Sequence, residues 1–380
     1  MKNILITGAR APAALDLMRK LSAAGFTVYA ADSVKCPLSK VSSSISGYFL
    51  LPPPASNLLR FIETLEDIII RHNIDMIIPT CEEVFFMSRH KERLEKHCVV
   101  FCDDFQKLRL LHNKYAFLEA AKDCGVLIPE TDLIDSRQAL HGLTHTEQKV
   151  FKPVFSRFAS HTLIRPEKTA LQSITLSKEF PWVAQAYIPG TEYCTYSIAV
   201  NGRLQAHSCY QPKYRAGIGS GIYFIPALRV DIREFVDNFV KKHHYTGQIG
   251  FDFIITEQNE LYVLECNPRA TSGIHCLPDS REWEQIIVGN RQTPLTSESR
   301  HKMVSLAMMT FGLKYLRQVF WLTLLKDFYK AHDPVWNRHD RAPSFYQCIS
   351  LMEIIIKAMK QRVSLKEAAT ADIEWNGEPL

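Results

Sequence analysis

Two apolar segments that each carry a carboxylate constrain the fold of this 380-residue chain most strongly. Residues 250–255 have the sequence Gly-Phe-Asp-Phe-Ile-Ile, and residues 261–269 have the sequence Leu-Tyr-Val-Leu-Glu-Cys-Asn-Pro-Arg. Their length and their apolar, aromatic composition are typical of β-strands, and the polar residues 256–260 predict a turn between them. An antiparallel hairpin of these two strands would bring Asp252 and Glu265 together.

The residues after Glu265 are expected to extend this cluster. Side chains two positions apart on a strand project to the same face, so Asn267 and Arg269 should lie beside Glu265, whereas Cys266 should point into the core. Two carboxylates and an amide oxygen form a hard-oxygen site suited to Mg²⁺ that also holds phosphate oxygens. Arg269 adds a planar fork for an anion. The alternative is that both acids are exposed strand residues, placed by simple alternation.

The first 105 residues alternate between strand and helix patterns. Apolar runs predict strands at 3–7, 27–31, 76–79 and 99–102, and amphipathic periodicity predicts helices at 13–24 and 58–72. Strands separated by helices favour a parallel sheet with helices on both faces.

The middle of the chain is richer in strands, and its end is mainly helical. A helix is expected over 105–124, and a second over 232–243. Strands are expected at 149–153, 182–187, 192–200, 204–210, 250–255 and 261–266. With 380 residues, 46% apolar and 22% charged, the chain is an ordinary globular protein of two or three domains.

Composition excludes several classes of protein. The 45 basic and 40 acidic residues give a net charge of +5 without long runs of one sign, so nucleic acid is not expected as a partner. The apolar stretch 319–325 is too short to cross a bilayer, and the first residues lack the apolar core of a signal peptide. The ten cysteines form no CxxC pair, which excludes a zinc ribbon and favours a cytoplasmic protein with reduced thiols.

The first strand-to-helix loop has features of a dinucleotide site. Residues 8–12, Gly-Ala-Arg-Ala-Pro, contain only one glycine of the G-x-G-x-x-G pattern, although Asp32 lies where a ribose-binding acid could sit. An NAD(P)-dependent oxidoreductase is therefore the less favoured alternative.

The order of motifs resembles that of the ATP-grasp superfamily, which includes D-alanine–D-alanine ligase, biotin carboxylase and the large subunit of carbamoyl phosphate synthase. The hairpin with Glu-Cys-Asn-Pro-Arg is similar to the metal-binding signature of that family. Lys114 is similar to its early nucleotide-contacting lysine, and Lys152 in Val-Phe-Lys-Pro is similar to the lysine that contacts the ATP phosphates. Residues 185–192, Gln-Ala-Tyr-Ile-Pro-Gly-Thr-Glu, resemble the hinge between its domains.

The resemblance implies a set of site residues. Glu192 would hold the ribose hydroxyls, and the adenine edge would meet the backbone of Gln185, Ala186, Tyr187 and Ile188. The ligands of Mg²⁺ or Mn²⁺ would be Asp252, Glu265 and Asn267. The charge of the transferring phosphoryl group would be neutralised by Lys152, Arg269 and Arg215.

The resemblance, which covers roughly residues 1–290, also implies the fold class, a combination of α/β and α+β architecture. Residues 1–105 would form a Rossmann-like pre-ATP-grasp domain, and residues 106–187 a lid with its linking helix. Residues 188–298 would form a β-rich catalytic core, and residues 299–380 a helical extension.

The implied activity is ATP- and Mg-dependent ligation. A small-molecule carboxylate would be activated as an acyl phosphate for attack by an amine or a similar nucleophile, with neither nucleic acid nor membrane as a partner; a homodimer is left open. The alternative is an ATP-grasp-like protein that binds nucleotide without turnover, because residues 153–161 contain no glycine to cradle phosphates. The side chains of Ser156, Arg157 and Ser160 could contact phosphate instead.

Two further segments are candidates for substrate contacts. Residues 211–221 combine Lys213 and Arg215 with three glycines, which favours a mobile segment that moves basic side chains onto a substrate anion, with a plain hairpin loop as the alternative. Residues 270–275 are expected to line the acceptor pocket. There His275 either orients the substrate or is structural.

Overall fold

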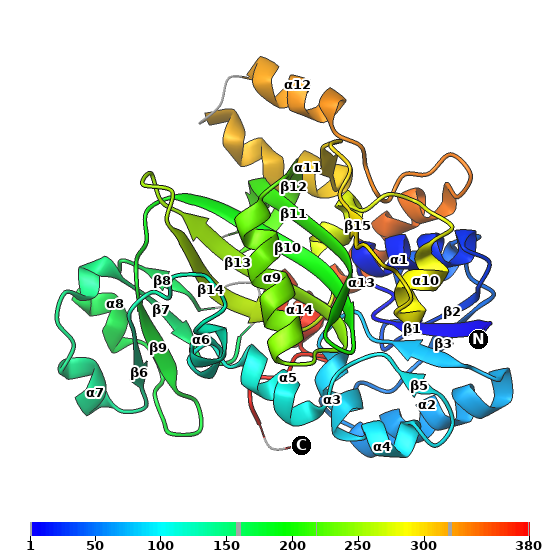
Figure 1. Cartoon of the computed structure of the whole chain (residues 1–380), viewed down its shortest axis with the longest axis horizontal. Helices are drawn as coiled ribbons and strands as arrows, with labels where there is room; N and C mark the ends of the chain where they lie inside the picture. Colours follow the sequence, from blue (N-terminus) through cyan, green and yellow to red (C-terminus); the bar gives the residue numbers. More distant parts are fainter. Residues whose placement is uncertain (1, 157–160, 218, 318–320, 379) are drawn as a thin grey trace.

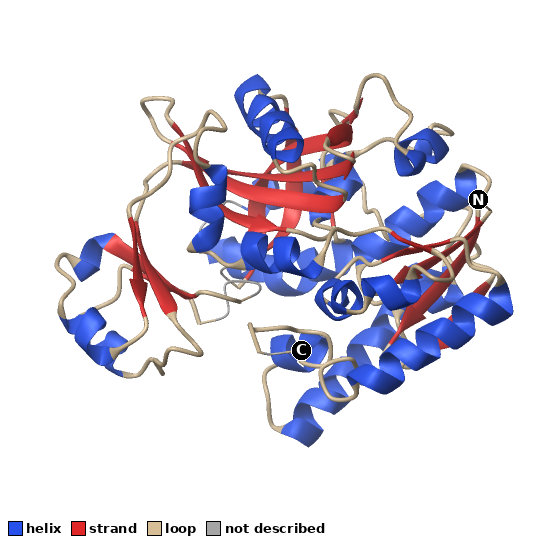
Figure 2. Cartoon of the chain, turned by 60° about the horizontal axis from the view of Figure 1, so that its bottom comes forward, coloured by secondary structure: helices blue, strands red, loops and turns tan. Residues whose placement is uncertain are grey.

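The computed structural model of the chain describes residues 2–156, 161–217, 219–317, 321–378 and 380. These residues contain a parallel sheet of five strands, a central sheet of seven strands and a small antiparallel sheet of four strands. Figure 1 follows the chain through them in order, and Figure 2 shows the small sheet set apart from the other two. Arg157 and Ser160 lie outside the described residues.

The N-terminal sheet has the strand order β3-β2-β1-β4-β5, with every pair parallel. Its strands are β1 (Asn3–Thr7), β2 (Thr27–Asp32), β3 (Gly47–Leu50), β4 (Met76–Ile78) and β5 (Val99–Val100). Alternate strand residues face opposite helices: Ile4 and Ile6 pack with α1 (Pro12–Ala23), and Leu5 packs with α2 (Leu58–His72). The predicted sheet is confirmed. The sequence pattern did not predict β3, α3 (Glu83–Arg89), α4 (Lys91–Leu94) or the 3₁₀ turn η1 (Leu38–Val41).

The single helix expected over 105–124 is wrong, because the chain forms two helices, α5 (Phe105–His112) and α6 (Ala116–Ala121). Asn113 adopts an extended conformation, and its side-chain oxygen accepts hydrogen bonds from the amides of Tyr115 and Ala116 at 3.0 and 2.9 Å. Lys114 falls in this break, where its amide donates to the Val154 carbonyl at 3.1 Å. The break therefore ties Lys114 to the small sheet.

The small sheet has the order β6-β9-β7-β8 and its own core. Its strands are β6 (Thr131–Ile134), β7 (Lys149–Pro153), β8 (Leu163–Ile164) and β9 (Trp182–Ala186). The short helices α7 (Arg137–His141) and α8 (Lys168–Gln172) and the 3₁₀ turn η2 (Thr146–Gln148) complete the unit. Phe151 and Ile134 are fully buried in this core.

The central sheet carries the predicted hairpin at one edge. Its long strands are β10 (Thr191–Val200), β11 (Arg203–Ala216), β12 (Ser220–Ala227), β13 (Gly247–Ile255) and β14 (Leu261–Asn267), and β15 (Leu295–Thr296) and β16 (Lys302–Met303) are short. Helix α9 (Val230–Lys242) packs Phe235 and Phe239 against Phe251 of β13.

Of the two alternatives for residues 211–221, the structure agrees with the hairpin, because most of this segment is paired in β11 and β12. Lys213 and Arg215 lie on β11, and Gly217, with φ of +72°, lies in the turn before β12. Tyr214 and Tyr223 are paired across these strands and are buried, and this burial holds both strands on the sheet. The Lys213 Nζ lies 2.7 Å from Asp327 and not in a substrate loop.

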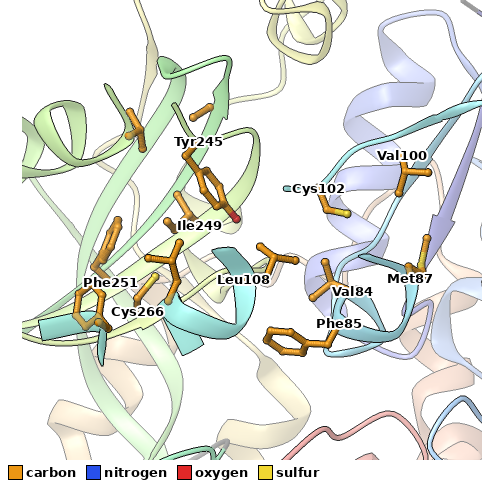
Figure 3. Packing of buried hydrophobic residues seen from close by; sticks show 14 of the residues in the cluster. Val84, Phe85, Met87, Val100, Cys102, Leu108, Tyr245, Ile249, Phe251 and Cys266 are labelled. Atoms are coloured by element: carbon orange, nitrogen blue, oxygen red, sulfur yellow. The ribbon is translucent and has the colours of Figure 1, made fainter. Parts of the chain in front are cut away.

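One core joins the N-terminal sheet to the central sheet. Figure 3 shows Leu108 of α5 with Val84 and Phe85 of α3 on one side and Ile249 and Cys266 of the central sheet on the other. Cys266 is buried there, as predicted. The hairpin of β13 and β14 therefore has a fixed position relative to the N-terminal domain.

The C-terminal region begins with η3 (Ser272–Cys276) and α10 (Trp283–Val288) and continues, beyond β16, with α11 (Ser305–Phe311), η4 (Gly312–Arg317), α12 (Trp321–Lys330), α13 (Ala342–Gln361) and α14 (Leu365–Thr370). The chain then returns to the N-terminal domain, where Trp375 is 1% exposed. Its ring centroid lies 5.0 Å from Phe85, 5.5 Å from Phe105 and 5.1 Å from Phe155. The C-terminal segment thus connects the N-terminal domain, the linking helices and the end of β7.

Within the described residues, none of the helices has both the length and the apolar composition of a membrane span.

We predict that Trp375→Ala lowers the free energy of unfolding by about 3–5 kcal/mol, because it removes a buried indole from an aromatic cluster. Trp336, which is 44% exposed, provides the matched control, and Trp336→Ala should cost about 0.5 kcal/mol. Urea titration monitored by circular dichroism measures both. Equal losses for the two variants would contradict the role given to the C-terminal segment.

Candidate functional site

A cavity of about 670 Å³ lies where the three sheets meet. Lys152 of β7, Glu265 of β14 and Ala11, which precedes α1, all line it. The residues that the resemblance implies for the nucleotide, the metal and the transferring phosphoryl group all line this cavity: Lys114, Lys152, Gln185, Ala186, Tyr187, Ile188, Glu192, Arg215, Asp252, Glu265, Asn267 and Arg269. The fold therefore brings together residues that are spread over more than 150 positions of the sequence.

The hairpin places two carboxylates opposite one another. Asp252 on β13 is the direct partner of Glu265 on β14, and a bulge follows this pair. The Asn267 amide group donates to Asp252 Oδ2 at 3.5 Å, so it lies on the same face, as predicted. Among the described residues no three His, Cys, Asp or Glu side chains converge, so a third side-chain ligand for a cation here would be the amide oxygen of Asn267.

Three cations surround this pair. Lys114 Nζ and Lys152 Nζ each lie 3.9 Å from Glu265 Oε2. Burial would raise the pKa of Glu265, but Lys114, Lys152 and Arg269 lower it, and the result is a pKa below its usual range. Burial raises the pKa of Asp252, and the negative charge of Glu265 raises it further. Because these two half-buried carboxylates face and repel one another, their oxygens and the Asn267 amide oxygen fit a divalent cation, whose charge offsets this repulsion.

Arg269 is held in place by several groups. It is 8% exposed, and its guanidinium donates to Asn267 Oδ1 at 3.1 Å and to the Ala270 carbonyl at 3.0 Å. Its Nε lies 3.7 Å from Glu82 Oε1, and Glu82 is fully buried. The second carboxylate oxygen of Glu82 accepts a hydrogen bond from the Trp375 amide at 3.3 Å. The sequence analysis missed Glu82, although an acid that closely follows a parallel strand was a usable signal.

The hinge residues line the cavity, but two of their amides are already engaged. The Ala186 amide donates to the Glu130 carbonyl at 2.8 Å, and the Tyr187 amide donates to the Gln148 carbonyl at 2.9 Å. The backbone of Ile188 is therefore the next part of this hinge that a purine edge could meet.

Glu192 and Arg215 form an ion pair with one another on the cavity wall. Burial lowers the pKa of Arg215, but the hydrogen bond and charge of Glu192 raise it above its usual value. Glu192, which was expected to hold the ribose, and Arg215, which was expected to hold an anion, therefore contact one another in this structure.

The first loop does not offer a dinucleotide site. Asp32 accepts hydrogen bonds from the Arg10 amide at 2.7 Å and from Arg10 Nε at 2.9 Å, so its carboxylate is already paired within the chain. The guanidinium of Arg10 also donates to Asp372 of the C-terminal segment at 2.9 Å. A Cβ at Gly8 would lie 2.5 Å from Thr80 Oγ1, so this glycine permits close packing of β1 against the loop after β4. These contacts argue against the oxidoreductase alternative.

The chain thus combines a parallel N-terminal sheet with a largely antiparallel central sheet and a small antiparallel sheet, and the cavity between them holds cations and two opposed carboxylates. Residues 111–273 match the family model of the ATP-grasp domain. They therefore form an ATP-grasp domain, and the resemblance found in the sequence is confirmed.

The chain is 25% identical over 222 residues to a curated relative, an uncharacterized protein of Methanocaldococcus jannaschii. The match covers 56% of this chain and 49% of the relative, so the chain matches about half the length of that protein.

Solved structures share the fold over most of their length. One is N5-carboxyaminoimidazole synthetase from Staphylococcus aureus (TM-score 0.61, 15% identity, 83% of this chain and 86% of that chain). Another is L-amino acid ligase from Bacillus licheniformis (TM-score 0.59, 14% identity, 78% and 76%). A third is the biotin carboxylase domain dimer of 2-oxoglutarate carboxylase from Hydrogenobacter thermophilus with MgADP, ADP and bicarbonate (TM-score 0.59, 15% identity, 77% and 71%). At these identities the likeness shows the shared fold.

We predict that Asp372→Asn destabilises the chain in a pH-dependent way. Burial would raise the pKa of Asp372, but the hydrogen bond and charge of Arg10 lower it well below its usual range. A lowered carboxyl pKa contributes stability above the unfolded-state value of about 3.9, and this contribution is lost as the pH falls toward the folded-state value. The variant should therefore lose about 1–3 kcal/mol at pH 7 and less at about pH 3.5. Urea unfolding at both pH values measures this, and an equal loss at both would contradict the ion pair.

Proposed function

We propose that the chain is an ATP-dependent ligase that activates a small-molecule carboxylate as an acyl phosphate and joins it to an amine. One observation carries the proposal: the opposed acids Asp252 and Glu265 face Lys114, Lys152 and Arg269 inside a cavity of an ATP-grasp domain. Such a cluster combines ligands for a cation with fixed positive charge for a polyanion.

The nucleotide would lie between the small sheet and the central sheet. Both sheets line the cavity, the first through Lys152 and Ala186 and the second through Glu192 and Asp252. The base would meet the hinge at Ile188, the ribose would meet Glu192, and the phosphates would lie against Lys114 and Lys152.

Mg²⁺ or Mn²⁺ would be held by Asp252, Glu265 and Asn267. When bound, the ion supplies positive charge to the phosphate oxygens and helps to align them. The facing carboxylate oxygens of Asp252 and Glu265 and the repulsion between the two acids support this assignment.

The residues of the chain would position the reactants and neutralise charge. A carboxylate oxygen of the substrate attacks the γ-phosphorus, the bond to the bridging oxygen breaks, and ADP leaves with the electron pair. Lys152 and Arg269 would stabilise the charge on the transferring group. Arg269 is already fixed by Asn267 and Glu82, so little reorganisation is needed.

The names of the structural relatives, a synthetase, an amino acid ligase and a biotin carboxylase domain, support ligation of small molecules. The ten free cysteines fit the predicted cytoplasmic location. The absence of glycine in residues 153–161 favours the second candidate, a protein that binds nucleotide without turnover.

Mg²⁺-dependent release of ADP separates these candidates. ATP would be supplied with mixtures of the twenty L-amino acids and small carboxylates, with and without hydroxylamine as the acceptor. The ligase predicts ADP release that requires a carboxylate and an acceptor. Binding of ATP with no ADP release under any mixture would favour the protein without turnover.

We predict that Glu265→Gln leaves the stability of the free protein nearly unchanged but removes most of the stabilisation by Mg-ATP. A ligand at about 100 times its dissociation constant adds roughly 2.7 kcal/mol, which raises the melting temperature by several degrees. Turnover should fall at least about a hundredfold. Glu260→Gln, in the exposed turn of the same hairpin, is the matched control. A variant that melts earlier without nucleotide but keeps its Mg-ATP shift would show that Glu265 is structural.

A further inference from the structure

We propose that His275, oriented by Asp16, is the general base that removes a proton from the amine acceptor. This role rests on the proposed ligase function. It narrows the acceptor substrate of the ligase to an amine that is protonated at neutral pH, because such an amine must lose a proton before it can attack. It assigns a catalytic role to a residue whose partner lies 259 positions away.

His275 and Asp16 form a buried dyad between η3 and α1. His275 is 2% exposed, and its Nδ1 lies 2.8 Å from Asp16 Oδ2. Asp16 Oδ1 lies 3.1 Å from Lys20 Nζ. Burial would raise the pKa of Asp16, but Lys20 and the hydrogen bond from His275 hold it well below its usual range. The ionised Asp16 therefore fixes the tautomer with the proton on Nδ1, which leaves the lone pair on Nε2.

The dyad borders the cavity of the proposed site. His275 lines the same cavity as Glu265 and Arg269, on the side of the N-terminal domain with Ala11 and Ala270. His275 also lines a second cavity of about 210 Å³. The other charged or titratable groups around that second cavity are Asp16, Arg19, Lys20, Asp279, Glu298, Arg300, Lys302 and His332. His275 therefore lines the cavity in which the acceptor of the proposed reaction would bind.

The chemistry of ligation requires such a group. An amine is an ammonium ion at neutral pH and has no free electron pair. A proton passes from its nitrogen to His275 Nε2, and the freed pair forms the C–N bond with the acyl carbon. The C–O bond to phosphate then breaks, and phosphate leaves with the electrons of that C–O bond. The leaving phosphate takes up the second proton that the nitrogen loses. Asp16 stabilises the imidazolium that forms.

A structural link between η3 and α1 would have the same contacts, so the test must separate the two roles. Hydroxylamine is uncharged at neutral pH and attacks an acyl phosphate without a base. His207 provides a matched control, because it is equally buried, pairs with Ser197 Oγ at 3.0 Å and is absent from the described lining of the cavity.

The experiment compares His275→Gln and His207→Gln with the wild type at pH 7, with ATP, Mg²⁺ and the twenty L-amino acids as donors. Amide formation with amino acid amines should fall at least about a hundredfold in His275→Gln, and hydroxamate formation should stay within about twofold. The amide deficit should narrow as the pH rises, because more of the amine is uncharged. His207→Gln should show no such split.

Equal losses with both acceptors would overturn the proposal and leave His275 structural. A wild-type protein that forms neither amide nor hydroxamate would refute the proposed ligase itself, and the general base would fall with it. The two failures are therefore distinguishable in one set of assays.

From the outer face of α13 we infer, independently of His275, that the chain forms a homodimer through this helix. The inner face of this helix contacts the chain through Glu353, which accepts hydrogen bonds from the amides of Lys35 and Cys36 at 2.9 and 2.7 Å. The outer face carries an exposed apolar row: Phe345, Ile349, Met352, Ile356 and Met359. An exposed apolar row of this length on one helix face is normally covered by another surface.

The spacing of this row fits a second copy of the same helix. The intervals of four, three, four and three residues match the seam of a coiled coil. If two copies lie antiparallel about a twofold axis near Ile354, Met352 meets the partner's Ile356, and Ile349 meets the partner's Met359. These five side chains are 47–73% exposed, and complete burial of that surface would cover on the order of 600 Å² per chain, about 1,200 Å² in the dimer, at the lower end for a stable interface.

Sedimentation of the full chain tests this inference. The wild type should be a dimer at micromolar concentration, and Met352→Glu should be a monomer with unchanged unfolding, because it places two charges near the axis. Met309→Glu, on exposed α11, is the matched control and should remain a dimer. A monomeric wild type would overturn the homodimer, as would a chain that binds anionic lipid vesicles through this helix and stays monomeric in solution.

Discussion

The register that sets Asp252 opposite Glu265 is the constraint on which the rest of the site depends. Two half-buried carboxylates that face one another repel, and positive charge nearby offsets this repulsion. That charge comes from separate parts of the chain: Lys114 from the break between two helices, Lys152 from the small sheet and Arg269 from the end of the hairpin. Assembly of the cavity from these separate segments therefore also brings positive charge to the pair.

The C-terminal segment holds this assembly together from outside the cavity. Trp375 packs against the N-terminal domain and the end of β7, and its amide binds Glu82, which in turn lies beside Arg269. Asp372 binds Arg10 in the first loop. A segment with no motif of its own thus fixes the orientation of a cation at the centre of the proposed site.

Local pattern predicted the strands and the hairpin because apolar runs and alternation report burial directly. It failed at Asn113, whose side-chain hydrogen bonds end one helix and begin another within a continuous apolar pattern. It also failed for long-range partners: nothing near Lys213 in sequence indicates Asp327, and nothing near His275 indicates Asp16. Such pairs follow from topology, which periodicity does not encode. The residues expected from the family resemblance do line one cavity, because the resemblance supplies that topology.

The central claim is that a carboxylate oxygen attacks the γ-phosphorus of ATP in this cavity. The most direct measurement is oxygen transfer: a donor carboxylate labelled with ¹⁸O is incubated with ATP, Mg²⁺, hydroxylamine and the protein, and the released phosphate is analysed by mass spectrometry. An acyl phosphate requires one labelled oxygen in each phosphate formed. Formation of ADP with unlabelled phosphate would contradict the account, because phosphate would then come from attack by water.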